Sequence, residues 1–138
     1  EFAPRCEIMP LPEAAPARWV STGFKLDDQT VRKVFLTVFG DPTRQLSLAQ
    51  CASGLGLSGR TLQRRLAASG AGFKDVVALA RLEVAARTLV ETATPLVEVG
   101  FLAGYSDQAH FSREFRRGTG MSPSSFRDLT GSTQPEPA

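Results

Sequence analysis

The sequence predicts an all-α domain in which two helix-turn-helix subdomains are joined by a long linker helix, with about seven helices in all. Three observations lead to this prediction. Apolar residues recur at helical spacing, glycines and capping residues interrupt them at short intervals, and one pattern of cap, glycine and apolar residues occurs twice, about 49 residues apart. The chain of 138 residues is long enough for one such domain with tails.

The downstream copy of this pattern begins with a short helix. Thr94 is expected to cap this helix, and Pro95 suits its first position because proline lacks the amide hydrogen that would be unpaired there. Gly100 and Gly104 follow, four residues apart. A small residue at 100 lets the next helix approach closely, and Gly104 permits the positive φ of a tight turn. These residues predict a helix followed by a sharp turn.

The second helix of this copy is expected to bury an aromatic side and expose a polar one. Ser106 or Asp107 can cap it, and Phe111 and Phe115 lie four residues apart on its inner side. The residues left facing outward are Gln108, His110, Ser112, Arg113, Arg116 and Arg117. Ser122, followed by proline, opens a closing helix. A helix with a packed back and a front of Arg, Gln and Ser fits the major groove of DNA.

The upstream copy occupies residues 48–70, and Ser47 is expected to cap its first helix. The matched positions are Ala52 and Gly56 for Gly100 and Gly104, Ser58 for Asp107, Leu62 and Leu66 for Phe111 and Phe115, and Arg64 for Arg113. One such motif is a weak signal, because many helical pairs are joined through a glycine turn. Two copies with matching cap, core and arginine positions favour a paired reader of DNA.

A long helix is expected between the two copies, over residues 73–91. Its apolar stripe consists of Val76, Leu79, Leu82, Ala86 and Leu89. Glu83 and Arg87 lie four residues apart, which predicts a favourable ion pair that contributes only about a few tenths of a kcal/mol.

Another helix is expected before the upstream copy, capped by Asp27 or Asp28 and ending near residue 39. Its inward residues are Val31, Val34, Phe35 and Val38. The phenylalanines of the downstream copy and of the linker helix are expected in the core; these are Phe73, Phe101, Phe111, Phe115 and Phe126.

Composition argues against several other classes of protein. No run of about 18 apolar residues is available to span a membrane. His110 is the only histidine, no Cys or His spacing suits a metal, and no glycine-rich loop follows a strand. We therefore expect no enzyme activity, no cofactor and no metal. Cys6 and Cys51 stand in unrelated contexts, which predicts reduced thiols and not a structural disulfide.

The charge is unevenly distributed along the chain. The net charge is +2, but residues 44–127 hold 11 Lys and Arg against 6 Asp and Glu, a balance of +5. The basic excess therefore coincides with the two copies. Arginine dominates it, and arginine can make paired hydrogen bonds to phosphate and to guanine. For a single arginine, a solvated helix face is the simpler interpretation, but the clustering on both second helices favours DNA.

The residues around the two turns are specific enough to indicate a family. They are LS at 57–58 and TLQRRL at 61–66, then GYSD at 104–107, FSR at 111–113, FRR at 115–117, Gly120, SP at 122–123 and FR at 126–127. With them, the stretch from about residue 30 to residue 127 resembles the DNA-binding domain of the AraC/XylS family of bacterial transcription regulators. Gly100 stands where the family usually has alanine, and Gly54 lies within the first short helix. Each glycine is expected to cost roughly 1 kcal/mol relative to alanine in a helix interior.

The resemblance implies sequence-specific binding of double-stranded DNA that regulates transcription. Two recognition helices would enter successive major grooves, about 34 Å apart. The expected base contacts are Arg60, Thr61, Gln63 and Arg64 in the first helix and Gln108, His110, Ser112 and Arg113 in the second. The expected phosphate contacts are Ser47, Arg65, Arg116, Arg117, Ser122 and Ser124. Arginine and glutamine suit guanine and adenine edges, respectively.

The expected organisation has three parts: a Pro-rich linker or the end of a missing N-terminal domain at 1–26, the DNA-binding domain at 27–130, and a disordered tail at 131–138. Within the domain we expect a first helix-turn-helix subdomain at 27–72, the linker helix at 73–92 and a second subdomain at 93–130. The chain begins without Met, so we expect an excised or processed piece. The resemblance implies a separate effector and dimerisation domain, RNA polymerase as a candidate partner besides operator DNA, no membrane partner, and a cytoplasmic, nucleoid-associated location.

Two other classes of function are compatible with the sequence. An architectural DNA-binding protein would bind unrelated duplexes equally well. A helical partner-binding or ligand-binding module would show no salt-dependent affinity for DNA.

Overall fold

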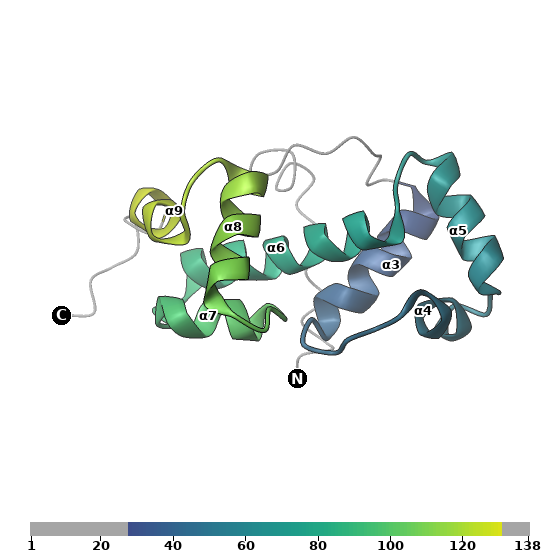
Figure 1. Ribbon diagram of the computed structural model, residues 1–138, viewed down its shortest axis with the longest axis horizontal. Coiled ribbons are helices and arrows are strands. Elements are labelled where there is room, and N and C mark those ends of the chain that lie inside the picture. Colours follow the sequence, from purple (N-terminus) through teal and green to yellow (C-terminus); the bar gives the residue numbers. More distant parts are fainter. Residues whose placement is uncertain (1–27, 131–138) are drawn as a thin grey trace.

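Seven α-helices and no strand make up residues 28–130, the part of the chain that this computed structural model describes (Figure 1). In chain order they are α3 (Gln29–Gly40), α4 (Leu48–Gly54), α5 (Gly59–Ala68), α6 (Phe73–Glu91), α7 (Leu96–Leu102), α8 (Gln108–Thr119) and α9 (Pro123–Thr130). For these residues the predicted all-α class is confirmed. The linker expected at 1–26 and the tail expected at 131–138 lie outside them.

The long helix α6 runs through the middle of the molecule, with α3, α4 and α5 around one end and α7, α8 and α9 around the other (Figure 1). At the first end, α3 packs along α6 and against α5, and α4 packs on α5. At the second end, α7, α8 and α9 all contact α6. Each end is therefore a three-helix unit, and α6 belongs to the core of both.

Helix α6 buries more of its surface than the sequence predicted. The five residues of the predicted stripe are all buried, as expected. Ala80 and Ala85 are also fully buried, and Glu83 is only 1% exposed. Different stretches of α6 are covered by α3 in one unit and by α7 and α9 in the other. A single stripe describes a helix packed on one side, whereas helices of both units pack on α6 and their buried residues form one cluster.

The predicted Glu83–Arg87 pair forms, but its burial makes the small energy expected for it inapplicable. Arg87 Nε donates to Glu83 Oε2 at 2.8 Å, but the Glu83 side chain is completely buried and that of Arg87 is 12% exposed. Burial raises the pKa of Glu83, and the hydrogen bond and charge of Arg87 partly oppose this. The Arg87 guanidinium also lies 5.4 Å from the centre of the Phe39 ring. Removing Arg87 would leave a buried charge uncompensated, which costs far more than the loss of a surface pair.

The helix starts follow the predicted caps, with one exception. Asp28 Oδ1 accepts from the amides of residues 30 and 31, at 2.9 and 3.1 Å. At α4, Ser47 and Gln50 form a reciprocal capping box. The cap predicted at Thr94 was wrong: Pro95 occupies the cap position without a side-chain hydrogen bond. The amide of Thr94 instead donates to Thr92 Oγ1 at 3.2 Å, in the short connection before α7.

Two further expectations need correction. Phe101 was expected in the core but is 51% exposed, because α7 packs inward through Val99 and Gly100 and leaves the following positions on its outer side. Gly54 is the last residue of α4, not an interior one, and an added Cβ there would meet nothing within 4 Å. The cost of a glycine inside a helix therefore does not apply to it.

Candidate nucleic-acid interface

The two turns have matching backbone geometry. Gly56, between α4 and α5, has a φ of 74°, and Gly104, between α7 and α8, has a φ of 101°. The amide that follows each glycine donates to the carbonyl five positions back, which is Ala52 in the first turn (2.8 Å) and Gly100 in the second (2.9 Å). The positive φ predicted at Gly104 is confirmed, and its counterpart Gly56 has a positive φ as well. The sequence repeat is therefore a structural repeat.

Helix α5 presents a basic outer face on an apolar anchor. Its cap is Ser58, whose hydroxyl oxygen accepts from the amide of Thr61 at 3.1 Å. Leu62 and Leu66 are buried, as predicted. The exposed residues of the predicted base and phosphate set on this helix are Arg60, Gln63, Arg64 and Arg65. Thr61 is only half-buried, and its hydroxyl accepts from that of Ser58 at 3.0 Å, so it is partly used in the cap.

Helix α8 has the same construction with aromatic anchors. Asp107 Oδ1 caps it by accepting from the amide of His110 at 2.7 Å. Phe111 and Phe115 are fully buried, with ring centres 5.7 Å apart. The Phe115 ring also meets Phe126 of α9 edge-on at 5.1 Å, which holds α8 between its neighbours. The exposed members of the predicted set on α8 are His110, Arg113, Arg116 and Arg117.

Two predicted base contacts on α8 are less available. Gln108 and Ser112 are both half-buried. The Oε1 atom of Gln108 is shut off from solvent and has no hydrogen-bond partner among the described residues. Gln108 would have to change its side-chain conformation before that oxygen could reach a base.

Gly100 has a packing role that explains the absence of alanine. A Cβ at this position would lie 2.9 Å from two carbon atoms of the Phe111 ring. The glycine thus lets the ring rest directly on the backbone of α7, which is the close approach that the sequence predicted. The cost of glycine in α7 is offset by tighter contact between the two helices.

The candidate phosphate contacts fall into two groups. The hydroxyl oxygens of Ser47 and Ser122 accept from the amides three residues further on, each at 3.1 Å, so both serines cap helices. The exposed candidates are Arg65, Arg116, Arg117 and Ser124. The Arg117 guanidinium donates to Glu114 at 3.0 Å.

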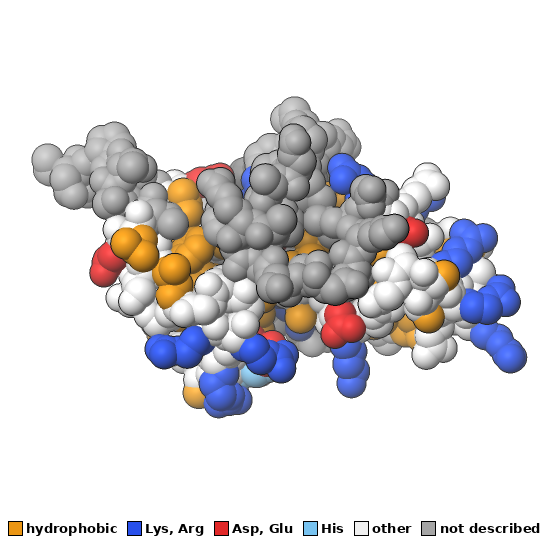
Figure 2. All heavy atoms as spheres, turned by 90° about the horizontal axis from the view of Figure 1, so that it is seen from above, with side chains coloured by type: hydrophobic (Ala, Val, Ile, Leu, Met, Phe, Trp, Pro, Cys, Tyr) orange, Lys and Arg blue, Asp and Glu red, His pale blue; other side chains and the backbone are white. Residues whose placement is uncertain are grey.

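Basic side chains gather toward both ends of the molecule (Figure 2). Helix α5 carries three arginines and no acidic residue, and α8 carries three arginines and a single glutamate. These helices lie in different units at opposite ends of α6 (Figure 1). The arrangement offers a polyanion two separate positive contact surfaces.

Residues 28–130 offer little basis for a metal site, a reactive cysteine or a membrane-spanning helix. They contain no group of three or more His, Cys, Asp and Glu side chains placed to hold a metal ion. Cys51 is free and buried, and burial raises the pKa of its thiol, which disfavours the reactive thiolate. Across the same residues, no helix combines the length and the apolar character that crossing a bilayer requires.

The fold and this surface define a DNA-binding domain with two helix-turn-helix units. A family model described as a helix-turn-helix domain matches residues 51–128. The Ornithine utilization regulator of Pseudomonas aeruginosa is 37% identical over 98 residues, which is 71% of this chain and 28% of that protein. A Putative AraC-like transcription regulator of Streptomyces antibioticus is 31% identical over 103 residues, 74% of this chain and 34% of that protein. The C-terminal domain of AraT, a response regulator from Geobacillus stearothermophilus, superposes with a TM-score of 0.66 at 26% identity, covering 80% of this chain and 93% of that one.

The chain belongs to the helix-turn-helix family of AraC/XylS DNA-binding domains. It is a domain for sequence-specific DNA binding in transcription regulation. The chain spans only 28% and 34% of the two regulators compared with it.

The sequence prediction missed one residue of this surface, Glu114. Its carboxylate accepts from Arg117 at 3.0 Å and lies 4.0 Å from His110 Nε2. The signal was present in the sequence, because Glu114 stands four residues after one of these side chains and three before the other. This carboxylate offsets part of the positive charge on the outer face of α8.

Glu114→Gln should therefore strengthen DNA binding. The substitution removes a negative charge beside Arg117, and we expect roughly a two- to fivefold gain in affinity for operator and unrelated duplex alike. Fluorescence anisotropy at fixed salt measures the gain. Glu91→Gln removes the same charge at the exposed end of α6 and serves as the control. An equal gain in both variants, or a gain in neither, would show that the Glu114 carboxylate does not restrain the recognition helix.

Proposed function

We propose that the complete protein is a transcription regulator that reads its operator with α5 and α8 in two successive major grooves. One observation carries this proposal: two matched turn-and-helix units stand at opposite ends of one continuous helix, and each presents exposed arginines on its second helix. A continuous α6 fixes the separation of the two recognition helices, as a protein that contacts successive grooves requires.

The proposed base contacts are Arg60, Thr61, Gln63 and Arg64 on α5 and Gln108, His110, Ser112 and Arg113 on α8. The proposed phosphate contacts are Ser47, Arg65, Arg116, Arg117, Ser122 and Ser124. The exposed arginines are the strongest members of both sets, because arginine binds guanine edges and phosphates with two parallel hydrogen bonds. Thr61 and Gln108 are the weakest, since each has a polar group that is already engaged or buried.

The rest of the protein is proposed by comparison with the longer regulators. An effector and dimerisation domain would precede residue 27, with residues 27–72, 73–92 and 93–130 as first subdomain, linker helix and second subdomain. RNA polymerase is the proposed protein partner at the promoter. The protein would work at the nucleoid in the cytoplasm and would have no enzyme activity, because its relatives are described as regulators.

Affinity for the operator should fall steeply as salt is added. Each phosphate neutralised by the protein releases a counterion, so four to six such contacts predict a loss of roughly 100- to 1,000-fold between 50 and 200 mM salt. The operator would first be selected from a random duplex library and located by footprinting. Anisotropy titrations at several salt concentrations then give the slope.

The control for that titration is an unrelated duplex of the same length. Operator and unrelated duplex should lose affinity along similar slopes while the preference for the operator persists. A binding constant that does not change with salt would exclude the nucleic-acid function. Equal affinity for both duplexes would instead indicate an architectural DNA-binding protein.

A further inference from the structure

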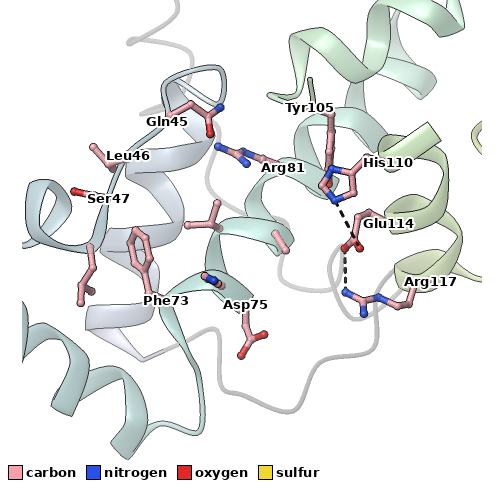
Figure 3. Close-up of a pocket in the computed structure, with 14 residues that line it drawn as sticks. Gln45, Leu46, Ser47, Phe73, Asp75, Arg81, Tyr105, His110, Glu114 and Arg117 are labelled. Atoms are coloured by element: carbon pink, nitrogen blue, oxygen red, sulfur yellow. Dashed lines mark hydrogen bonds and ion pairs between the residues drawn. The ribbon is translucent and has the colours of Figure 1, made fainter. Parts of the chain in front are cut away.

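A cleft of about 620 Å³ lies between the two helix-turn-helix units, over the N-terminal half of α6 (Figure 3). Residues 45–48, which lead into α4, form one wall, and α6 residues between positions 73 and 81 form the floor. The other wall consists of Tyr105 and three residues of α8: His110, Glu114 and Arg117. The cleft therefore joins the approach to one unit with the recognition helix of the other.

The cations that line the cleft include two without a counter-charge. Lys74 and Arg81, both on α6, make no hydrogen bond or ion pair with any described residue. Arg81 extends across the cleft in the direction of Gln45 (Figure 3). Its Nε atom is buried and has no hydrogen-bond partner within residues 28–130. A guanidinium held in this way, with its charge unneutralised, is a prepositioned partner for an anion.

The two carboxylates in the cleft are already engaged. Asp75 Oδ2 accepts from the amide of Gly72 at 3.1 Å and helps to cap α6. Glu114 accepts from Arg117 at 3.0 Å. Neither carboxylate has an ion pair with the two free cations of α6, so the positive charge on the floor remains available.

Tyr105 adds a further donor to the wall. It is 6% exposed, and its hydroxyl has no hydrogen-bond partner among the described residues. Burial, with a smaller contribution from the charge of Glu114, raises the pKa of Tyr105 to about 12, so the phenol stays protonated near neutral pH. The unpartnered groups of the cleft are thus cations and a neutral hydroxyl, which suits an anionic occupant.

The position of the cleft identifies that anion. The residues of α8 that line it are spaced by four and three positions and lie on one side of the helix, next to the exposed face that carries Arg113 and Arg116. If α5 and α8 enter successive major grooves, the duplex must cross the gap between them. The segment that crosses presents the sugar-phosphate backbone that borders the intervening minor groove, with one charge per roughly 1.7 Å of axis.

We propose that this cleft binds phosphodiester groups of the DNA backbone between the two major grooves, with Lys74 and Arg81 as its cationic partners. This inference rests on the proposed function, because it assumes that both recognition helices contact one duplex. It adds a third contact surface, formed by the linker helix, to the two recognition helices.

The test measures operator binding by Lys74→Gln and Arg81→Gln in the chain as it stands. Each variant should lose roughly tenfold in affinity for operator and unrelated duplex alike, and the salt slope should decrease by about 1. Neutral methylphosphonates placed at the phosphates between the two contacted grooves should weaken the wild type by a similar factor. They should weaken Lys74→Gln less than the wild type, because that variant has already lost one of the two cationic contacts and keeps only that of Arg81.

Lys33→Gln is the matched control, since Lys33 is an exposed lysine of α3 that does not line the cleft. Lys74 is exposed on the first turn of α6, so its substitution tests the proposal even if Arg81→Gln fails to fold. If Lys74→Gln keeps the wild-type affinity, salt slope and operator preference, the cleft does not bind the backbone. The proposed function of the two recognition helices would still hold. If the wild-type protein shows no preference for the operator over unrelated duplex, both the cleft site and the proposed function are overturned.

Discussion

Gly104→Ala should destabilise the domain by roughly 3 kcal/mol or more. The φ of Gly104 is 101°, a conformation that costs a residue with a side chain about 1–3 kcal/mol. An added Cβ would also overlap the backbone carbonyl of Pro42 and would lie 2.8 Å from Arg81 Nε. The Pro42 carbonyl belongs to the backbone of the loop after α3, so rotating a side chain cannot relieve the overlap. The two units of the domain would have to move apart.

Gly56→Ala measures the cost of the backbone conformation without the cost of steric overlap. Gly56 also has a positive φ, 74°, but an added Cβ would meet nothing within 4 Å. We expect a loss of about 1 kcal/mol from the backbone conformation alone, and a larger loss for Gly56→Val because a β-branched residue tolerates this conformation least. Urea denaturation of both alanine variants gives the difference. Equal losses at the two glycines would show that the contact between Gly104 and the Pro42 loop does not hold the units together.

The features predicted correctly from the sequence are local ones. Gly56 and Gly104 each indicate a turn, and a capping residue follows each of them within three positions. The buried pairs of α5 and α8 follow from four-residue spacing alone. Because the pattern occurs twice, the matching positions of one copy supported the assignment of the other. Once the buried pairs were assigned, the remaining residues of α5 and α8 defined their exposed faces.

The features that were missed depend on contacts between distant parts of the chain. Nothing in the sequence places residue 42 against residue 104, or Arg81 beneath that turn, so neither the close contact between the units nor the cleft beside it was predicted. Glu83 fitted the four-residue spacing of a helical ion pair, and its burial depends on the helices that pack around α6. Phe101 is the opposite case, an aromatic residue whose surface is 51% exposed. Apolar character gives a tendency toward burial, but the packing of whole helices decides it.

Arg64→Ala and Arg113→Ala should each relax sequence specificity in a different part of the operator. The two arginines hold matching positions, each two residues after the first buried anchor of its helix, which is Leu62 in α5 and Phe111 in α8. Both are exposed, and neither forms an ion pair with a described residue. An arginine that reads a guanine contributes about 1–3 kcal/mol of discrimination against other bases. Each variant should therefore bind the operator roughly 5- to 150-fold more weakly while tolerating changes at its own base pairs.

A panel of operators with single base-pair changes measures this effect, with Arg65→Ala and Arg116→Ala as controls. These neighbouring arginines are also exposed, but they belong to the proposed phosphate set. Their loss should weaken every operator in the panel by the same factor and lower the salt slope by about 1. If Arg113→Ala behaved like these controls while Arg64→Ala relaxed specificity, α5 would read bases and α8 would rest on the backbone. If both variants behaved like the controls, neither helix would read sequence through its central arginine, and the paired-reader proposal would be wrong. Relaxed specificity in both, at base pairs about one helical turn apart, is the result that two recognition helices held by one continuous α6 require.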